Sequence, residues 1–136
     1  MQVNPYVVFN GNCAEALKFY EECGIGRNDG MLKHAGTPAE SHVPAEWHDK
    51  IMHARLVIGD SVLMASDAPP EHYKKPQGFS VSLQFKDATE AQRIFNALSA
   101  GGQVRMPFGE TFWSPGFGML TDRFGIPWMI NTEGDH

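Results

Sequence analysis

The chain carries the stretch Gly11-Asn-Cys-Ala-Glu-Ala-Leu-Lys-Phe-Tyr-Glu-Glu-Cys-Gly24, and its pattern returns later as Lys86-Asp-Ala-Thr-Glu-Ala-Gln-Arg-Ile-Phe-Asn-Ala-Leu-Ser-Ala-Gly101. Both stretches place apolar residues at helical spacing and end in glycine, which predicts two amphipathic helices. A short apolar strand precedes each helix, and at least two strands follow it. The repeat therefore predicts a duplicated βαβββ module. We expect the two sheets to face one another and the functional site to lie in the cleft between them.

The first half of the chain is expected to begin with a strand at 6–9 and a helix capped by Asn12, with Glu15 three positions later. A weak strand is expected at 26–34. Residues 37–50 contain two prolines and no period, which indicates a loop. The clearest hairpin joins strands at 51–58 and 61–66 through the two-residue turn Gly59-Asp60.

The second half repeats this order, with a strand at 79–85, a helix at 89–100 and further strands at 104–112, 117–121 and 126–131. Alternation along the first of these strands assigns its two faces. Val81, Leu83 and Phe85 should pack under the helix, and the opposite face should be polar. The fold class is therefore α+β: one domain of two modules, at about 1–67 and 78–134, joined by a linker at about 68–77 and forming a cupped mixed sheet.

Composition narrows the possible partners. The 136 residues include 11 Lys plus Arg against 16 Asp plus Glu, a net charge of −5, so we expect no binding to nucleic acid. No apolar run is long enough to span a membrane, and the N-terminal residues do not resemble a secretion signal. Cys13 and Cys23 fall on one predicted helix about 15 Å apart, too far for a disulfide. We expect a cytoplasmic protein with free thiols.

Three segments in this order and spacing carry a family resemblance: PYVVFNGNCAEALKFYEECG at 5–24, IMHARLVIGDSVLMASD at 51–67 and DRFGIPWMIN at 122–131. The chain resembles the PhnB-like branch of the vicinal oxygen chelate superfamily. That superfamily includes glyoxalases, ring-cleaving dioxygenases, fosfomycin-modifying enzymes and bleomycin-binding resistance proteins. The resemblance implies paired βαβββ modules, usually dimeric, with a cupped small-molecule site.

The resemblance also implies four metal-ligand positions, on the first and last strands of each half. Alignment puts Pro5 or Tyr6, Met64, Ser80 and Met129 at these positions. Thioethers are soft and neutral hydroxyls are weak ligands, whereas divalent metals of this kind need carboxylate or imidazole. We therefore expect no metal and no cofactor. An alignment displaced by one or two residues is the alternative.

The hairpin register predicts what lines the cup instead. If the turn is Gly59-Asp60, Arg55 lies opposite Met64 and His53 lies opposite Ser66. A cation beside polar and methionine side chains suits a ligand with a polar or anionic head and an apolar body. Alternatively, Arg55 only pairs with an acidic residue such as Glu110 or Asp67. The predicted ligand-binding residues are His53, Arg55, Met64, Ser66, Ser80, Ser82, Gln84 and Met129.

His53 is the best candidate for proton transfer, because its ordinary pKa lies near neutrality. No nucleophile or paired carboxylate is visible beside it, so a hydrogen-bonded sheet histidine is the favoured interpretation. A different metal site with His53 is conceivable in and beside the long loop, although the spacings match no zinc signature. Its ligands would come from His34, His42, His48, Glu40, Glu46 and Asp49.

Two further features each allow two interpretations. Trp47, Trp113 and Phe117 either cap the cup as a lid or serve core or dimer packing. Cys13 lies in the first turn of a predicted helix, where a thiol can be activated, but a buried structural cysteine is the favoured interpretation.

Our leading hypothesis is a metal-free small-molecule-binding protein that forms a homodimer. The alternative is a metal-dependent lyase, isomerase or dioxygenase of the glyoxalase type that uses non-standard ligands. A third hypothesis is an interaction module that uses strand edges and aromatic residues. Similar sequences are also described as ubiquinone-pathway methyltransferases, but this chain lacks a Gly-rich first βα turn followed by an acidic ribose ligand, so we reject that description.

Overall fold

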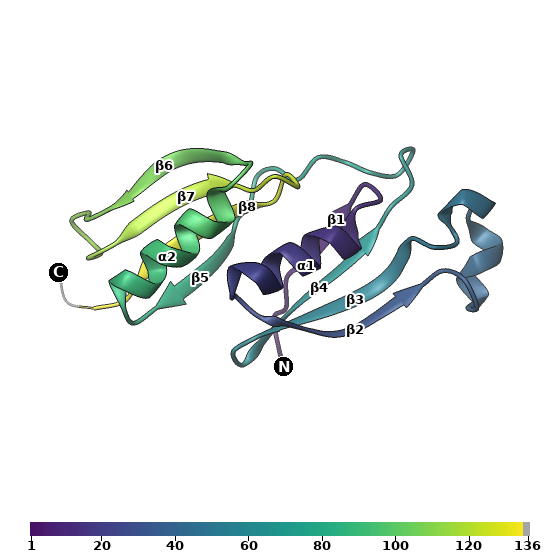
Figure 1. The fold of residues 1–136 in the computed structure, drawn as a ribbon, viewed down its shortest axis with the longest axis horizontal. Helices are drawn as coiled ribbons and strands as arrows, with labels where there is room; N and C mark the ends of the chain where they lie inside the picture. Colours follow the sequence, from purple (N-terminus) through teal and green to yellow (C-terminus); the bar gives the residue numbers. More distant parts are fainter. Residues whose placement is uncertain (135–136) are drawn as a thin grey trace. The chain divides into compact units, whose positions relative to one another are not determined.

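A computed structural model describes residues 1–134, and the chain divides into two compact units, Met1–Lys74 and the residues from Lys75 onward. Each unit contains one long helix lying across a four-stranded mixed sheet (Figure 1). Each unit also has the predicted βαβββ order. The α+β prediction with two modules is therefore confirmed.

The first unit contains β1 (Tyr6–Phe9), α1 (Cys13–Cys23), β2 (Arg27–Lys33), β3 (Ile51–Ile58) and β4 (Ser61–Asp67). Its strand order is β1-β4-β3-β2, with β1 parallel to β4 and the other pairs antiparallel. The hairpin turns at Gly59-Asp60 as predicted, with Gly59 at a φ of 57°. The expected loop contains two short 3₁₀ helices, Pro38–His42 and Ala45–Trp47.

The second unit contains β5 (Val81–Phe85), α2 (Ala88–Ser99), β6 (Gln103–Gly109), β7 (Phe117–Thr121) and β8 (Pro127–Thr132). Its order, β5-β8-β7-β6, repeats that of the first unit, again with its first and last strands parallel. The strand β6 ends three residues earlier than predicted. Thr111 and Ser114 close a local turn there, with the Thr111 N–H donating to the Ser114 carbonyl at 2.9 Å.

Each core lies between the helix and one face of its sheet. Alternation explains this arrangement, because every second strand residue points to the same side. The prediction holds for Val81 and Leu83, which are buried, whereas Phe85 is half-buried. The largest fully buried side chains are Phe9, Leu17, Tyr20, Leu56 and Leu63 in the first unit and Ile94, Leu98, Leu120, Ile126, Trp128 and Ile130 in the second.

A distant carboxylate, rather than the predicted cap, satisfies the start of α1. Asn12 occupies the N-cap position but makes no side-chain hydrogen bond, so this part of the prediction was wrong. Instead, the backbone N–H of Cys13 donates to Asp67 Oδ1 at 2.9 Å, and Ile51 N–H donates to Asp67 Oδ2 at 2.9 Å. The buried Asp67 thus joins the beginnings of α1 and β3 to the end of β4.

A second buried carboxylate fixes the turn between β7 and β8. Asp122 Oδ1 accepts the N–H groups of Phe124 and Ile126, at 2.8 and 3.1 Å. Its Oδ2 accepts the indole N–H of the fully buried Trp128 at 2.8 Å. One side chain therefore satisfies three donors that the tight turn would otherwise leave unpaired.

Within residues 1–134, no helix is long and apolar enough to cross a membrane.

Candidate functional site

The face of each sheet that its helix does not cover is the candidate site, and we call these faces the first and second open face. Most of the predicted ligand-binding side chains lie on them because they alternate with the buried core residues. On the first open face, His53, Met64 and Ser66 are half-buried, and Arg55 is exposed.

The register of the first sheet confirms one prediction and adds a neighbour. Arg55 lies opposite Met64, as predicted, and Tyr6 is the parallel partner of Met64 on its other side. The pairing of β3 with β4 begins with Ala54 opposite Ala65. The predicted pair of His53 and Ser66 would come next, one residue beyond the end of this pairing. The His53 ring lies near the Tyr6 ring, with centroids 6.0 Å apart.

Arg55 has an acidic neighbour that the sequence analysis did not name. Its Nε lies 3.8 Å from Asp29 Oδ2, and both side chains are nearly half exposed. Asp67, one of the two partners considered, instead accepts two backbone N–H groups within the core. Because exposed ion pairs contribute about 0–1 kcal/mol, Asp29 does not prevent Arg55 from binding an anion.

The second open face carries a row of methionines. Cross-strand partners link Met106 to Met119, Met119 to Met129 and Met129 to Ser82. Met129 and Ser82 were predicted from the sequence as site residues, whereas Met106 and Met119 were not. Alternation in Phe117–Thr121 could have found Met119, whereas a register shift between Val104 and Met106 hides Met106 from any period-2 pattern.

Polar side chains form a network next to this row. The Gln84 amide donates to Ser82 Oγ at 2.9 Å, and the Asn131 amide donates to Gln84 Oε1 at 2.8 Å. Asn131, like Met106 and Met119, was not predicted from the sequence as a site residue. Ser80 lies just before β5 and is half-buried. The second open face thus combines thioether surface with amide and hydroxyl groups.

These residues do not fit the divalent metal that the superfamily implies. The register pairs Tyr6 with Met64. It pairs Met129 with Ser82, two residues after Ser80, which the alignment had placed at the third position. All of these positions present phenol, hydroxyl or thioether groups. A hard divalent cation prefers carboxylate, imidazole or water ligands. Across the part of the chain that the structure describes, no three His, Cys, Asp or Glu side chains are placed to hold a metal ion.

Two of the loop histidines and the three aromatic residues considered as a lid have local neighbours. His34 is buried, with Nδ1 2.9 Å from the Lys50 carbonyl, and His48 Nδ1 lies 3.4 Å from Glu40 Oε1. Trp47 is half-buried beside Gly11. Trp113 makes edge-on contacts with Phe112 and Phe117, at centroid distances of 4.8 and 5.4 Å.

Cys13 has the properties of a structural residue. Its side chain is fully buried, and burial, followed by the nearby charge of Asp67, raises its pKa from 9.0 to about 12. The thiolate is the nucleophilic form of cysteine, so a raised pKa makes the thiol inert near neutral pH.

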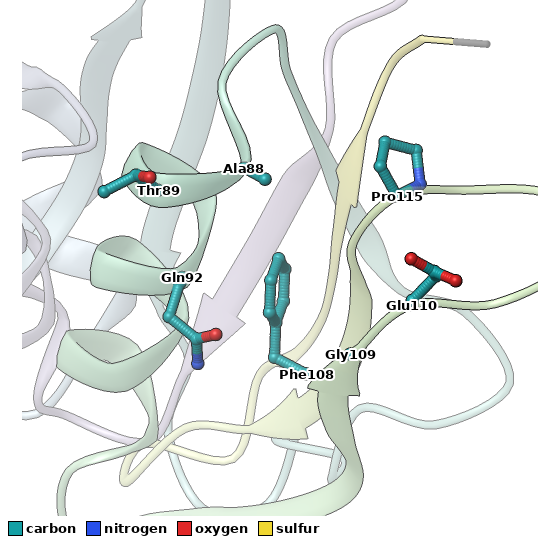
Figure 2. Close-up of a pocket in the computed structure, with 7 residues that line it drawn as sticks. All are labelled: Ala88, Thr89, Gln92, Phe108, Gly109, Glu110 and Pro115. Atoms are coloured by element: carbon teal, nitrogen blue, oxygen red, sulfur yellow. The ribbon is translucent and has the colours of Figure 1, made fainter. Parts of the chain in front are cut away.

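A hollow of about 430 Å³ lies beside α2 (Figure 2). Thr89 and Gln92 of the helix line it together with Phe108, Glu110 and Pro115. Its charged residue is a carboxylate, which does not suit the anionic ligand expected from the sequence. We therefore place the candidate site on the open faces.

The fold is that of the vicinal oxygen chelate superfamily. At 18% identity, a glyoxalase family protein from Bacillus cereus shares it with a TM-score of 0.67, over 98% of this chain and 94% of that one. The PhnB protein from Bacillus cereus, also 18% identical, shares it with a TM-score of 0.79, over 98% and 100% of the two chains.

The family of this chain is shown by a matching family model and by relatives of higher sequence identity. The chain belongs to the PhnB-like family whose model, described as 3-demethylubiquinone-9 3-methyltransferase, matches residues 1–131. Protein YjdN of Escherichia coli (strain K12) is 35% identical over 139 residues, covering 96% of this chain and 95% of that protein. Protein PA1353 from Pseudomonas aeruginosa is 50% identical, covers 99% of both chains and superposes with a TM-score of 0.88.

Proposed function

We propose that this PhnB-like protein binds a small amphiphilic ligand, with a polar or anionic head, on its open faces and without a divalent metal. The observation that carries the proposal is the pair of methionines, Met64 and Met129, on the last strand of each module. Thioethers give a soft, adaptable apolar surface in place of hard metal ligands.

The first open face offers the chemistry for a polar head. Arg55 supplies a guanidinium that can donate two parallel hydrogen bonds to a carboxylate or phosphate. Beside it, Met64 and the Tyr6 ring supply apolar contact area. His53 and Ser66 add polar groups to the first open face. On the second open face, taken by itself, the proposed ligand-binding residues are Ser80, Ser82, Gln84 and Met129.

A metal-dependent lyase, isomerase or dioxygenase of the glyoxalase type is the alternative, with His53 and loop residues as non-standard ligands. It would require activity that chelation abolishes and that His53→Ala lacks. The family is described as a methyltransferase family, but we do not extend that activity to this chain. The turn between β1 and α1, Asn10-Gly11-Asn12, lacks the Gly-rich pattern that holds a dinucleotide-like cofactor.

The role of Arg55 is tested by ligand screening. A panel of small carboxylates and phosphates is measured by calorimetry against the unaltered protein, and its best ligand is then measured against Arg55→Ala. We expect affinity to fall about tenfold or more, because a hydrogen bond to a charged group contributes about 1.5–3 kcal/mol.

Lys18→Ala is the matched control, since Lys18 is an exposed cation on α1, which covers the opposite face of the sheet. It should leave affinity unchanged. If Arg55→Ala and the unaltered protein bind with equal affinity, Arg55 does not contribute to ligand binding. If no ligand of the panel binds, the proposed function is contradicted.

A further inference from the structure

The second unit contains a separate pocket of about 250 Å³. One wall is the segment that enters β5, including Lys75 and Phe79, and another wall is Arg105 of β6. Thr121 and Pro127, from the neighbouring strands β7 and β8, also line it. The pocket therefore spans most of the width of the second sheet.

The register puts this pocket on the second open face. Gln103, Thr121 and Pro127 are successive cross-strand partners, so they form one row across three strands. Thr121 follows the core residue Leu120 and so points away from α2. No residue of α2 is among those that line the pocket.

Strand β6 contributes a cation to the pocket. The register shifts between Val104 and Met106, which leaves Arg105 as an extra residue in the strand. Bulges at sheet edges re-aim side chains, and β6 is an edge strand of this sheet. Arg105 lies two residues after Gln103 and therefore on the same face by alternation, and the bulge turns Met106 to that face as well, opposite Met119.

The charge of the pocket is entirely positive. Lys75 and Arg105 are its charged residues, and Gln77 and Gln103 add amide groups. Within residues 1–134, the side chains of Lys75 and Arg105 have no ion-pair or hydrogen-bond partner, unlike Arg55, which has Asp29. Two unneutralised cations in one pocket, in a chain of net charge −5, favour an anionic ligand.

An apolar surface lies next to these cations. Met119 and Met129 are two residues from Thr121 and Pro127 along their strands, about 7 Å away on the same face. They are cross-strand partners of one another, and Met106 extends the row. Phe79, 47% exposed, adds a ring to the wall of the pocket.

We propose that this pocket binds the carboxylate of an amphiphilic organic acid. The carboxylate pairs with Lys75 and Arg105, and the apolar chain lies along Phe79 and the methionine row. This inference rests on the proposed function, because it names the ligand class for the second open face. The anionic head of the ligand is thereby assigned to Lys75 and Arg105 rather than to Arg55. Neither of these two cations was predicted from the sequence as a site residue.

The test uses sodium decanoate, below its micelle concentration, titrated into the full chain labelled with ¹³C at the methionine methyl groups. Saturable shifts are expected for Met106, Met119 and Met129. Lys75→Gln and Arg105→Gln should each weaken binding about tenfold, as expected for the loss of a charge-assisted hydrogen bond. Decanol, which lacks the charge, should bind more weakly, and added salt should weaken decanoate binding.

Lys74→Gln is the matched control, since this neighbouring lysine does not line the pocket. It should bind decanoate as the unaltered chain does. Because both pocket variants change exposed side chains, their folding can be checked from unchanged amide spectra. If either variant misfolds, the other variant and the decanol comparison still test the proposal.

The outcomes separate the two proposals. If Arg55→Gln weakens decanoate binding and the two pocket variants do not, the inference fails and the proposed function stands. The inference also fails if decanoate does not bind while another ligand from the panel does, or if decanol binds as tightly as decanoate. If neither decanoate nor any panel ligand binds, both proposals fail.

Discussion

Asp67 and Asp122 show how single buried side chains determine local structure in this protein. Each carboxylate accepts hydrogen bonds from donors at points where the backbone leaves a regular element. Buried donors without partners are costly, so these residues restrict how the chain can turn. Asp67 also bears on chemistry, because its charge adds to the burial that keeps the Cys13 thiol protonated.

Asp67→Ala should lower the free energy of unfolding by about 2–6 kcal/mol, because two buried N–H groups lose their acceptor at about 1–3 kcal/mol each. Asp67→Asn should cost less, since its amide oxygen still accepts one of the two bonds. Urea unfolding followed by circular dichroism measures both changes. Asp60→Ala, in the exposed hairpin turn, is the control and should change stability by less than about 0.5 kcal/mol. Equal stability of Asp67→Ala and the control would contradict this role.

The packing of α2 on its sheet depends on a close approach at β7. A Cβ on Gly118 would lie 2.6 Å from the Phe95 ring of α2 and 3.0 Å from the Phe108 backbone. Glycine is therefore required at this position by space rather than by backbone conformation. The neighbouring rings of Phe95 and Phe108, with centroids 5.7 Å apart, fill the volume that a larger residue would need.

Gly118→Ala should destabilise the second unit by about 1–3 kcal/mol, the usual cost of overpacking a core. Gly109→Ala is the matched control, since Gly109 lies at the end of β6 with no atom near its added Cβ. It should be neutral within about 0.5 kcal/mol. Thermal unfolding of the two variants gives the comparison. A Gly118→Ala variant as stable as the control would show that α2 adjusts without cost.

The two units repeat one topology but present different open faces. The first carries Arg55 and His53, whereas the second carries the methionine row and the cations Lys75 and Arg105. Duplication explains the shared strand order, and divergence of the outward residues explains the different chemistry. The fold alone therefore does not identify the ligand, which has to be inferred from the residues of the site.

Elemental analysis and native mass spectrometry test the protein as a whole. Purified without a His-tag or chelator, it should contain much less than one equivalent of Ni, Zn, Mn or Fe, because the strand positions offer thioethers and hydroxyls. We also expect a mass twice that of the 15.1 kDa chain, since two-fold homodimers are the commonest oligomers. One metal equivalent per chain would favour the metalloenzyme alternative, and a monomer would contradict the expected dimer.

Much of the fold could be predicted from the sequence because it depends on local patterns. The hairpin Ile51–Ile58 to Ser61–Asp67 follows from alternation and a Gly-Asp turn, and its register gave the opposition of Arg55 and Met64 correctly. The sequence repeat between the two helical stretches predicted that the two units share one topology, and their strand orders agree. In all these cases, the residues that decide the structure lie within one element or one turn.

The tertiary structure alone decided the contacts between residues far apart in the sequence. Asp67 replaces Asn12 at the start of α1 across 54 residues, and Asp29 rather than Asp67 lies beside Arg55. The bulge at Arg105 and the pocket that Arg105 and Lys75 both line likewise follow from how β6 pairs and how the chain enters β5. Periodicity determines which face a residue occupies, but only the packed chain determines which partners it meets.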